Sequence, residues 1–89
     1  MRTVHIKISG KVQGVFFRAS AKEIADKLKI TGWVKNTLEG DVEIVAEGSS
    51  ESIEEFLEWC KKGPPKAFVS HLNFTETESA KLKNFRIIR

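Results

Sequence analysis

The sequence predicts an α+β fold in which two helices cover one face of an antiparallel sheet. Two kinds of segment follow one another along the chain. In one kind, apolar and polar residues alternate, as in a half-buried strand. In the other, apolar residues recur every three or four positions, as in an amphipathic helix. They follow the order strand, helix, strand, strand, helix, strand, and a short extra strand ends the chain. Packing both helices on one sheet face buries every apolar stripe and gives the ferredoxin-like βαββαβ sandwich.

The first half of the chain supplies one helix and three strands. Their predicted ranges are a strand at 4–9, a helix with Arg18 in its first turn and its apolar stripe over 21–28, and two strands at 33–37 and 42–47. The strands alternate between apolar and polar side chains, and the helix places apolar residues at i, i+3, i+4 and i+7. Gly40, between the two later strands, can adopt the positive φ that a hairpin turn requires.

The second half supplies the other helix and the last two strands. Ser49 or Ser50 can cap the N-terminus of this helix, and the Gly-Pro-Pro run at 63–65 ends it. The predicted strands are 67–77 and 85–88. In the longer strand, every second residue from Phe68 to Phe74 is expected on one face.

Length and composition indicate one small globular domain, residues 1–89. Of its residues, 40% are apolar and 30% charged, and the net charge of +3 is spread along the chain. So mild an excess can steer a small anion but is weak support for nucleic-acid binding. Cys60 is the single cysteine, and no apolar run resembles a signal peptide or a membrane span. We therefore expect a cytoplasmic protein with no membrane partner.

The usual catalytic and metal-binding side chains are scarce. His5 and His71 are too few and too differently placed to form a convincing metal site, so each is expected on a strand surface. Cys60 falls on the apolar stripe of the second helix, which indicates a buried thiol and not a nucleophile. Trp33 and Trp59 are expected to pack in the core or at its edge.

The segment from Gly10 to Arg18 joins the first strand to the first helix and is the candidate binding site. Gly10 and Gly14 bracket the turn, and the helix N-terminus that follows offers backbone N–H groups and a positive dipole end to an anion. Arg18 falls in the first helical turn, where its guanidinium could hold a phosphate with a bidentate fork. A purely structural turn remains the alternative, because no longer phosphate-loop motif is present.

Asn36 is the second candidate residue. Asparagine is unusual inside a strand, and the second strand of a βαββαβ sandwich follows directly from the first helix, which can bring Asn36 near the loop. Its amide both donates and accepts hydrogen bonds but is not a base. It could therefore orient a water or a substrate oxygen, and it could not abstract a proton.

Two motifs in this order resemble those of the acylphosphatase family. The first motif is matched by Gly10, Val12, Gln13, Gly14, Val15, Phe17 and Arg18. The second motif is matched by Gly32, Trp33, Val34, Lys35, Asn36, Gly40, Val42 and Gly48. Further similarities lie at 63–69 and at the terminal run 85–87, so the resemblance spans essentially the whole chain.

The resemblance implies an enzyme that hydrolyses the carboxyl–phosphate bond of acyl phosphates, without a metal or other cofactor. Arg18 would bind the phosphoryl oxygens, and Asn36 would position the attacking water. The backbone amides expected to share in phosphate binding are those of Gln13, Gly14, Val15, Phe16, Phe17 and Arg18. The substrate's own phosphate would accept the water proton, which explains why no His, Asp or Glu base is needed. Inorganic phosphate would be both product and inhibitor.

Two binding modules compete with the enzyme. A domain that binds an acyl or carbamoyl phosphate without significant turnover would carry the same residues, and only an assay of phosphate release separates the two. An RNA-binding domain of the same fold needs aromatic side chains on the open sheet face, where the third strand has Glu43 and Glu47. We therefore expect a small-molecule acyl phosphate substrate, no nucleic-acid partner and a monomer.

Overall fold

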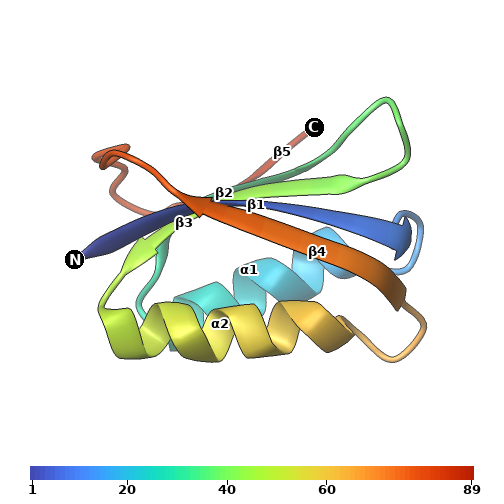
Figure 1. Ribbon diagram of the computed structural model, residues 1–89, viewed down its shortest axis with the longest axis horizontal. Coiled ribbons are helices and arrows are strands. Elements are labelled where there is room, and N and C mark those ends of the chain that lie inside the picture. Colours follow the sequence, from blue (N-terminus) through green and yellow to red (C-terminus); the bar gives the residue numbers. More distant parts are fainter.

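The computed structural model describes all 89 residues and contains two layers, a sheet and a pair of helices (Figure 1). The elements are β1 (Arg2–Lys11), α1 (Phe17–Lys27), β2 (Thr31–Asn36), β3 (Val42–Gly48), α2 (Ser50–Lys62), β4 (Phe68–Glu76) and β5 (Phe85–Ile88). Both helices lie against the same face of the sheet, as the sequence predicts. Neither helix is long and apolar enough to cross a membrane.

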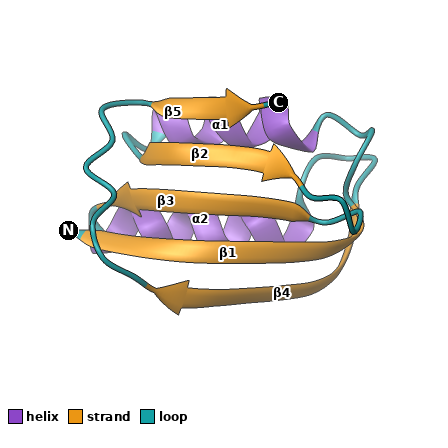
Figure 2. Ribbon diagram, turned by 90° about the horizontal axis from the view of Figure 1, so that it is seen from above, coloured by secondary structure: helices purple, strands orange, loops and turns teal.

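The sheet has the strand order β4-β1-β3-β2-β5 (Figure 2). The predicted antiparallel pairing is confirmed for the first four strands. The extra strand β5 instead runs parallel to β2, so the complete sheet is mixed. The reason is the connection at 77–84, which leaves the end of β4 and crosses to the opposite edge of the sheet. The chain therefore enters β5 from the end at which β2 also begins.

The predicted face of β4 is wrong at its first residue. The ladder between β1 and β4 shifts register at Gly10, and Ser70 is left as an extra residue without a partner. This bulge reverses the in–out alternation, so Val69 packs against the core while Phe68 is exposed. Gly10 permits the close approach, because a Cβ there would lie 2.2 Å from the carbonyl oxygen of Phe68.

An aromatic cluster in the core fixes the start of α1. Phe17, the first residue of α1, packs edge-on against Trp59 of α2, with ring centroids 5.3 Å apart. Trp59 in turn lies 6.2 Å from Phe56, which also meets Phe85 of β5 at 6.0 Å. The expected packing role of Trp59 is thus confirmed. Because full burial of such a ring contributes about 2 kcal/mol, this cluster holds the N-terminus of α1 in place.

The other face of the sheet carries no helix and is lined mainly by charged and polar side chains, with the pair Trp33 and Val45 among them. His5 of β1 contacts Glu43 of β3 at 2.5 Å, and Lys35 of β2 lies 3.7 Å from the same carboxylate. The hydrogen bond from His5 lowers the pKa of Glu43 below its usual range. Glu47 is more buried and accepts a hydrogen bond from Thr3 at 2.9 Å. No row of stacking rings occupies these β3 positions.

Candidate active site

The loop between β1 and α1 leaves the helix without a capping side chain. Gly14 has a φ of 74°, and a side chain there would meet no protein atom, so the backbone conformation alone favours glycine. Phe16 occupies the N-cap position of α1 in the left-handed region, at φ 64°, and makes no side-chain cap. No acidic residue lies in the first turn. The positive end of α1 is therefore neither capped nor neutralised.

The backbone of this loop presents a continuous row of free donors. None of the N–H groups from Gln13 to Ala19 donates to a backbone carbonyl. The first hydrogen bond of the helix runs from the Ser20 N–H to the Phe16 carbonyl at 3.0 Å. All the amides predicted to bind phosphate, from Gln13 to Arg18, belong to this row. Such groups need an acceptor, and an anion can satisfy several of them together.

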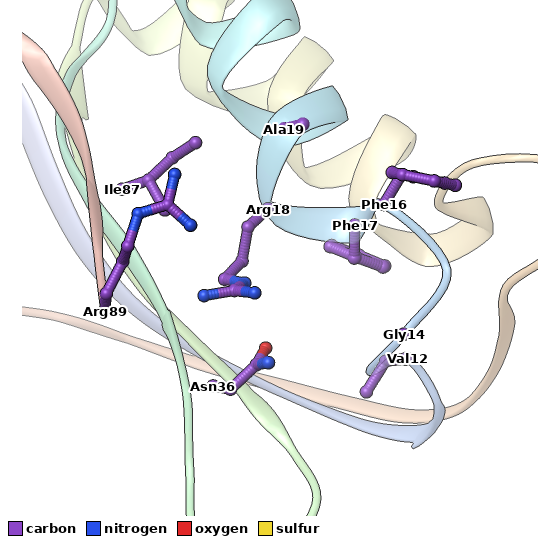
Figure 3. A pocket seen from close by; sticks show the side chains of 9 residues that line it. All are labelled: Val12, Gly14, Phe16, Phe17, Arg18, Ala19, Asn36, Ile87 and Arg89. Carbon is purple, nitrogen blue, oxygen red and sulfur yellow. The ribbon is translucent and has the colours of Figure 1, made fainter.

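A cavity of about 330 Å³ lies at the N-terminus of α1, beside the ends of β2 and β5 (Figure 3). Its lining combines loop, helix and strand residues: Val12, Gly14, Phe16, Phe17, Arg18, Ala19, Asn36, Ile87 and Arg89. Arg18 and Asn36, separated by a whole helix in sequence, thus reach the same cavity. Figure 3 shows the Arg18 guanidinium pointing toward the Asn36 amide.

Arg18 and Asn36 are both free to bind a ligand. Neither side chain forms a hydrogen bond or an ion pair within the protein, whereas Arg2 is held by Glu54 and Glu76 at 2.7 Å each. No Asp or Glu side chain lines the cavity, so the positive charge of Arg18 adds to that of the helix end. The electrostatic preference of this cavity is for an anion.

Gln13 has a side-chain role that the sequence did not reveal. Its amide nitrogen donates to the carbonyl oxygens of Thr37 at 2.9 Å and Asp41 at 2.8 Å. These bonds tie the loop to the β2–β3 turn, next to Asn36, and they hold the two halves of the site together. Since the Gln13 side chain is occupied and Val15 is buried in the core, only the backbone of either residue can meet a ligand.

Four cavity residues were not among the predicted site residues. They are Val12, Ala19, Ile87 and Arg89. The last two reach the cavity because β5 pairs in parallel with β2, with Val34 opposite Ile87 and Lys35 opposite Ile88. The sequence predicted this strand at 85–88 and a terminal motif at 85–87, but neither signal placed the strand beside the cavity.

The other side chains considered for chemistry lie elsewhere. Cys60 is fully buried, and burial raises the pKa of its thiol far above the usual range, which agrees with an inert core position. His71 lies exposed on β4, and His5 lies on the uncovered sheet face. No group of three or more His, Cys, Asp or Glu side chains gathers anywhere in the structure.

Fold and cavity together define a class of protein. A two-layer α+β sandwich that directs a free helix N-terminus and an arginine into one small cavity has the architecture of an anion-binding domain. The acylphosphatase family model matches residues 4–87. The chain therefore belongs to the acylphosphatase family, as its two sequence motifs predict.

Individual relatives agree with this assignment. The acylphosphatase of Coxiella burnetii (strain RSA 493 / Nine Mile phase I) is 49% identical over 84 residues, which are 94% of this chain and 88% of that protein. The crystal structure of acylphosphatase from Bacillus subtilis matches with a TM-score of 0.96 and 40% identity over 100% of both chains. The predictions of a ferredoxin-like fold and of an acylphosphatase enzyme are thus confirmed.

The same fold also occurs inside a larger protein. The crystal structure of HypF from T. kodakarensis matches with a TM-score of 0.87 and 34% identity. The match covers 100% of this chain but 12% of that one. A domain of this kind can therefore exist as part of a longer chain.

Proposed function

We propose that this protein hydrolyses the carboxyl–phosphate bond of a small acyl phosphate, with Arg18 and Asn36 as its catalytic residues. One observation carries the proposal: Arg18, Asn36 and the loop residues Gly14, Phe16 and Phe17, whose N–H groups have no backbone acceptor, line one cavity. Membership of the acylphosphatase family supports the same reaction. The products are a carboxylate and inorganic phosphate.

In this proposal, Arg18 and the loop bind the phosphoryl group. A guanidinium presents two parallel donors to two phosphoryl oxygens. The backbone N–H groups from Gln13 to Arg18 are available for the remaining acceptor positions, because they have no backbone acceptor of their own. Positioning and charge stabilisation are the main contributions that a protein makes to phosphoryl transfer, and this site supplies both.

Asn36 orients the attacking water. The water oxygen bonds to phosphorus while the bond from phosphorus to the carboxyl oxygen breaks, and the electron pair of that bond leaves with the carboxylate. One proton of the water passes to a phosphoryl oxygen of the substrate. Because a carboxylate is a weak base, it leaves without a general acid. The cavity lining, which contains no His, Asp or Glu side chain, fits a reaction of this kind.

The apolar part of the cavity accommodates the acyl group. Val12, Phe16 and Ile87 line the cavity beside the polar groups, and the Phe16 ring is 78% exposed. A rigid ring gains contact area against an apolar group at little conformational cost. We therefore expect an aromatic acyl phosphate to be a usable substrate.

Benzoyl phosphate hydrolysis in the presence of a chelator tests the proposal. Absorbance reports loss of the substrate, and released phosphate is measured separately. We expect turnover that the chelator does not change, with inorganic phosphate as a competitive inhibitor. Turnover that needs added metal, or phosphate that fails to compete, would contradict the proposed chemistry.

We further infer a monomer in the cytoplasm that acts without a nucleic-acid partner. The net charge of +3 is small, and charged pairs such as His5 with Glu43 occupy the open sheet face where RNA-binding domains place aromatic rings. The free Cys60 agrees with a reducing compartment. Sedimentation analysis at several protein concentrations would test the monomer.

A further inference from the structure

The side-chain amide of Gln13 connects the two loops that flank the proposed catalytic groups. Gln13 lies in the β1–α1 loop, and its Nε2 donates to the carbonyl oxygens of Thr37 at 2.9 Å and Asp41 at 2.8 Å. Those two residues belong to the β2–β3 turn, which lies at the same end of the sheet as the loop (Figure 2). No other hydrogen bond joins this loop to this turn. Gln13 is therefore the polar link between the loop and the strand end that carries Asn36.

The two hydrogens of this amide hold both sides of the turn. Thr37 follows the last residue of β2, and Asp41 precedes the first residue of β3. The turn is also closed by its own bonds, from the Thr37 N–H to the Asp41 carbonyl at 2.9 Å and from the Asp41 N–H to the Thr37 hydroxyl at 3.1 Å. Because a carbonyl oxygen has two lone pairs, the Asp41 oxygen can accept from both Thr37 and Gln13. The Gln13 amide thus binds the turn as a unit and fixes it relative to the loop.

The placement of Asn36 depends on this link. Its side chain lines the cavity without a hydrogen-bond partner in the protein, so its backbone determines where the amide lies. On one side that backbone is held by the pairing of Asn36 with Val42 in the β2–β3 ladder. On the other side comes Thr37, whose carbonyl is held by Gln13. A movement of the turn would displace the Asn36 amide, and a displacement of about 1 Å in an active site can lower a rate by about 10²-fold.

The backbone of Gln13 belongs to the proposed phosphoryl site. Its N–H is the first in the row of free donors. Val12 and Val15 are buried on either side of it. Gly14 and Phe16 adopt left-handed conformations, at φ 74° and 64°, so contacts and not regular hydrogen bonds order this loop. An anion that binds the loop N–H groups orders the loop further, and the Gln13 side chain passes this ordering to the turn.

We propose that Gln13 is a positioning residue that couples anion binding at the loop to the placement of Asn36. Its backbone faces the phosphoryl group, while its side chain fixes the turn that follows the water-orienting residue. The rate of the chemical step then depends on a side chain that touches neither substrate nor water. The inference rests on the proposed function for the role of Asn36, but the coupling between loop and turn can be measured without turnover.

The variant Gln13→Met tests the effect on catalysis. Methionine keeps the length of the side chain, offers no N–H donor and leaves the backbone N–H groups of the loop in place. We expect kcat for benzoyl phosphate to fall about tenfold, and the inhibition constant of phosphate to change by less than about twofold. In the Asn36→Ala background the same substitution should cause no further loss, because Gln13 acts through Asn36.

Thr3→Val is the matched control. The Thr3 hydroxyl donates to Glu47 at 2.9 Å, so this variant also removes a side-chain hydrogen bond between distant segments, and it lies outside the cavity. We expect a similar loss of stability in both variants, while kcat of Thr3→Val stays within about twofold of the wild-type value. An equal fall in kcat in Thr3→Val would assign the effect of Gln13→Met to lost stability and would overturn the inference.

Hydrogen exchange measures the coupling without turnover. The N–H groups of Gly40 and Asp41 form hydrogen bonds within the turn, and their exchange is followed by NMR with and without inorganic phosphate. We expect phosphate to slow this exchange about fivefold in the wild type. In Gln13→Met, phosphate should still bind but leave the exchange of these two groups unchanged.

The two measurements separate this inference from the proposed function. If the wild type releases no phosphate from benzoyl phosphate but shows the protection of the turn, the proposed function fails and the coupling stands. If kcat of Gln13→Met equals that of the wild type, or if the losses add in the double variant, the inference fails and the proposed function stands. Protection of the turn by phosphate in Gln13→Met would show that the loop acts on the turn by another route, and it would refute the role of Gln13.

Discussion

The N-termini of the two helices are built in opposite ways. At the start of α2, the Ser49 hydroxyl accepts a hydrogen bond from the Ser52 N–H at 3.1 Å, and Glu51 lies in the first turn. At the start of α1, Phe16 occupies a left-handed N-cap without a capping bond, and Arg18 lies in the first turn. The two helices pack on the same face of one sheet, with their N-termini at opposite ends of it (Figure 1).

The comparison separates stability from function. A good N-cap contributes about 1 kcal/mol, and a left-handed non-glycine residue costs about 1–2 kcal/mol. A cation near a helix N-terminus is also unfavourable. The start of α1 therefore gives up stability at each of these points, and the packing of Phe17 against Trp59 offsets the loss. In return, the N-terminus of α1 keeps a row of free N–H groups and an unpaired guanidinium.

Removing the cation at the α1 end has the largest expected effect. We predict that Arg18→Ala lowers kcat/KM for benzoyl phosphate by about 10³-fold or more and abolishes inhibition by phosphate. Arg18→Lys should fail nearly as badly, because a point charge does not reproduce the bidentate fork. Steady-state kinetics with increasing inorganic phosphate measure both effects.

Lys22→Ala is the matched control for Arg18. Lys22 lies in the same helix, outside the cavity, and pairs with Asp26 at 2.8 Å. Its loss removes one positive charge, and we expect kcat/KM to stay within about twofold. Near-normal turnover in Arg18→Lys would show that any cation suffices and that the fork has no special role.

Asn36→Ala is expected to change a different step. We predict that kcat falls by about 10²-fold, as for loss of one important transition-state group, while the inhibition constant of phosphate is unchanged. Asn73→Ala, at an exposed position of β4, serves as the control and should leave both values unaltered. Weaker phosphate binding in Asn36→Ala would mean that Asn36 holds the phosphoryl group and does not orient water.

The sequence could predict the parts of this site that depend on local patterns. Alternation and helical spacing indicated the elements, and the loop with Arg18 and the strand residue Asn36 carried recognisable motifs. The parallel pairing of β5 is different, because it depends on which sheet edge the 77–84 connection reaches. At that edge Phe85 packs against Phe56, far away in sequence, and the parallel pairing brings Arg89 to the cavity.

Two further features could not be predicted from the sequence, for the same physical reason. The bulge at Ser70 exposes Phe68 only because β4 must follow β1 past Gly10, a contact between the two ends of the chain. The Gln13 side chain bonds to carbonyl groups of the β2–β3 turn, and a backbone acceptor leaves no mark in a sequence. In both cases contacts between residues far apart in the sequence determine the local structure, and local sequence preferences do not.

Breaking the cap of α2 should affect stability alone. We predict that Ser49→Ala lowers the free energy of unfolding by about 1 kcal/mol, because the Ser52 N–H loses its acceptor. Urea unfolding followed by circular dichroism measures this change. The values of kcat and KM should equal those of the wild type, since Ser49 lies outside the cavity. An altered kcat would mean that the two helix ends are coupled and would undermine the comparison.

The smallest expected effect comes from relieving the strain at the α1 end. Glycine adopts the left-handed conformation of Phe16 freely, and the ring is mostly exposed, so Phe16→Gly removes strain and little buried surface. The greater freedom of glycine in the unfolded chain offsets part of this gain. We predict an increase of about 0.5 kcal/mol in the free energy of unfolding. The same variant should raise KM for benzoyl phosphate about threefold, because the acyl ring loses an aromatic contact.

The inhibition constant of phosphate shows whether Phe16→Gly affects the acyl group alone or also the phosphoryl site. The backbone N–H groups of the loop remain in Phe16→Gly, so phosphate should bind as it does to the wild type. A protein that is more stable and binds the acyl group less well would show that the left-handed phenylalanine is kept for the substrate. A less stable protein with unchanged KM would show instead that the ring supports the loop, and the contrast between the two helix ends would then reduce to Arg18 and the missing cap.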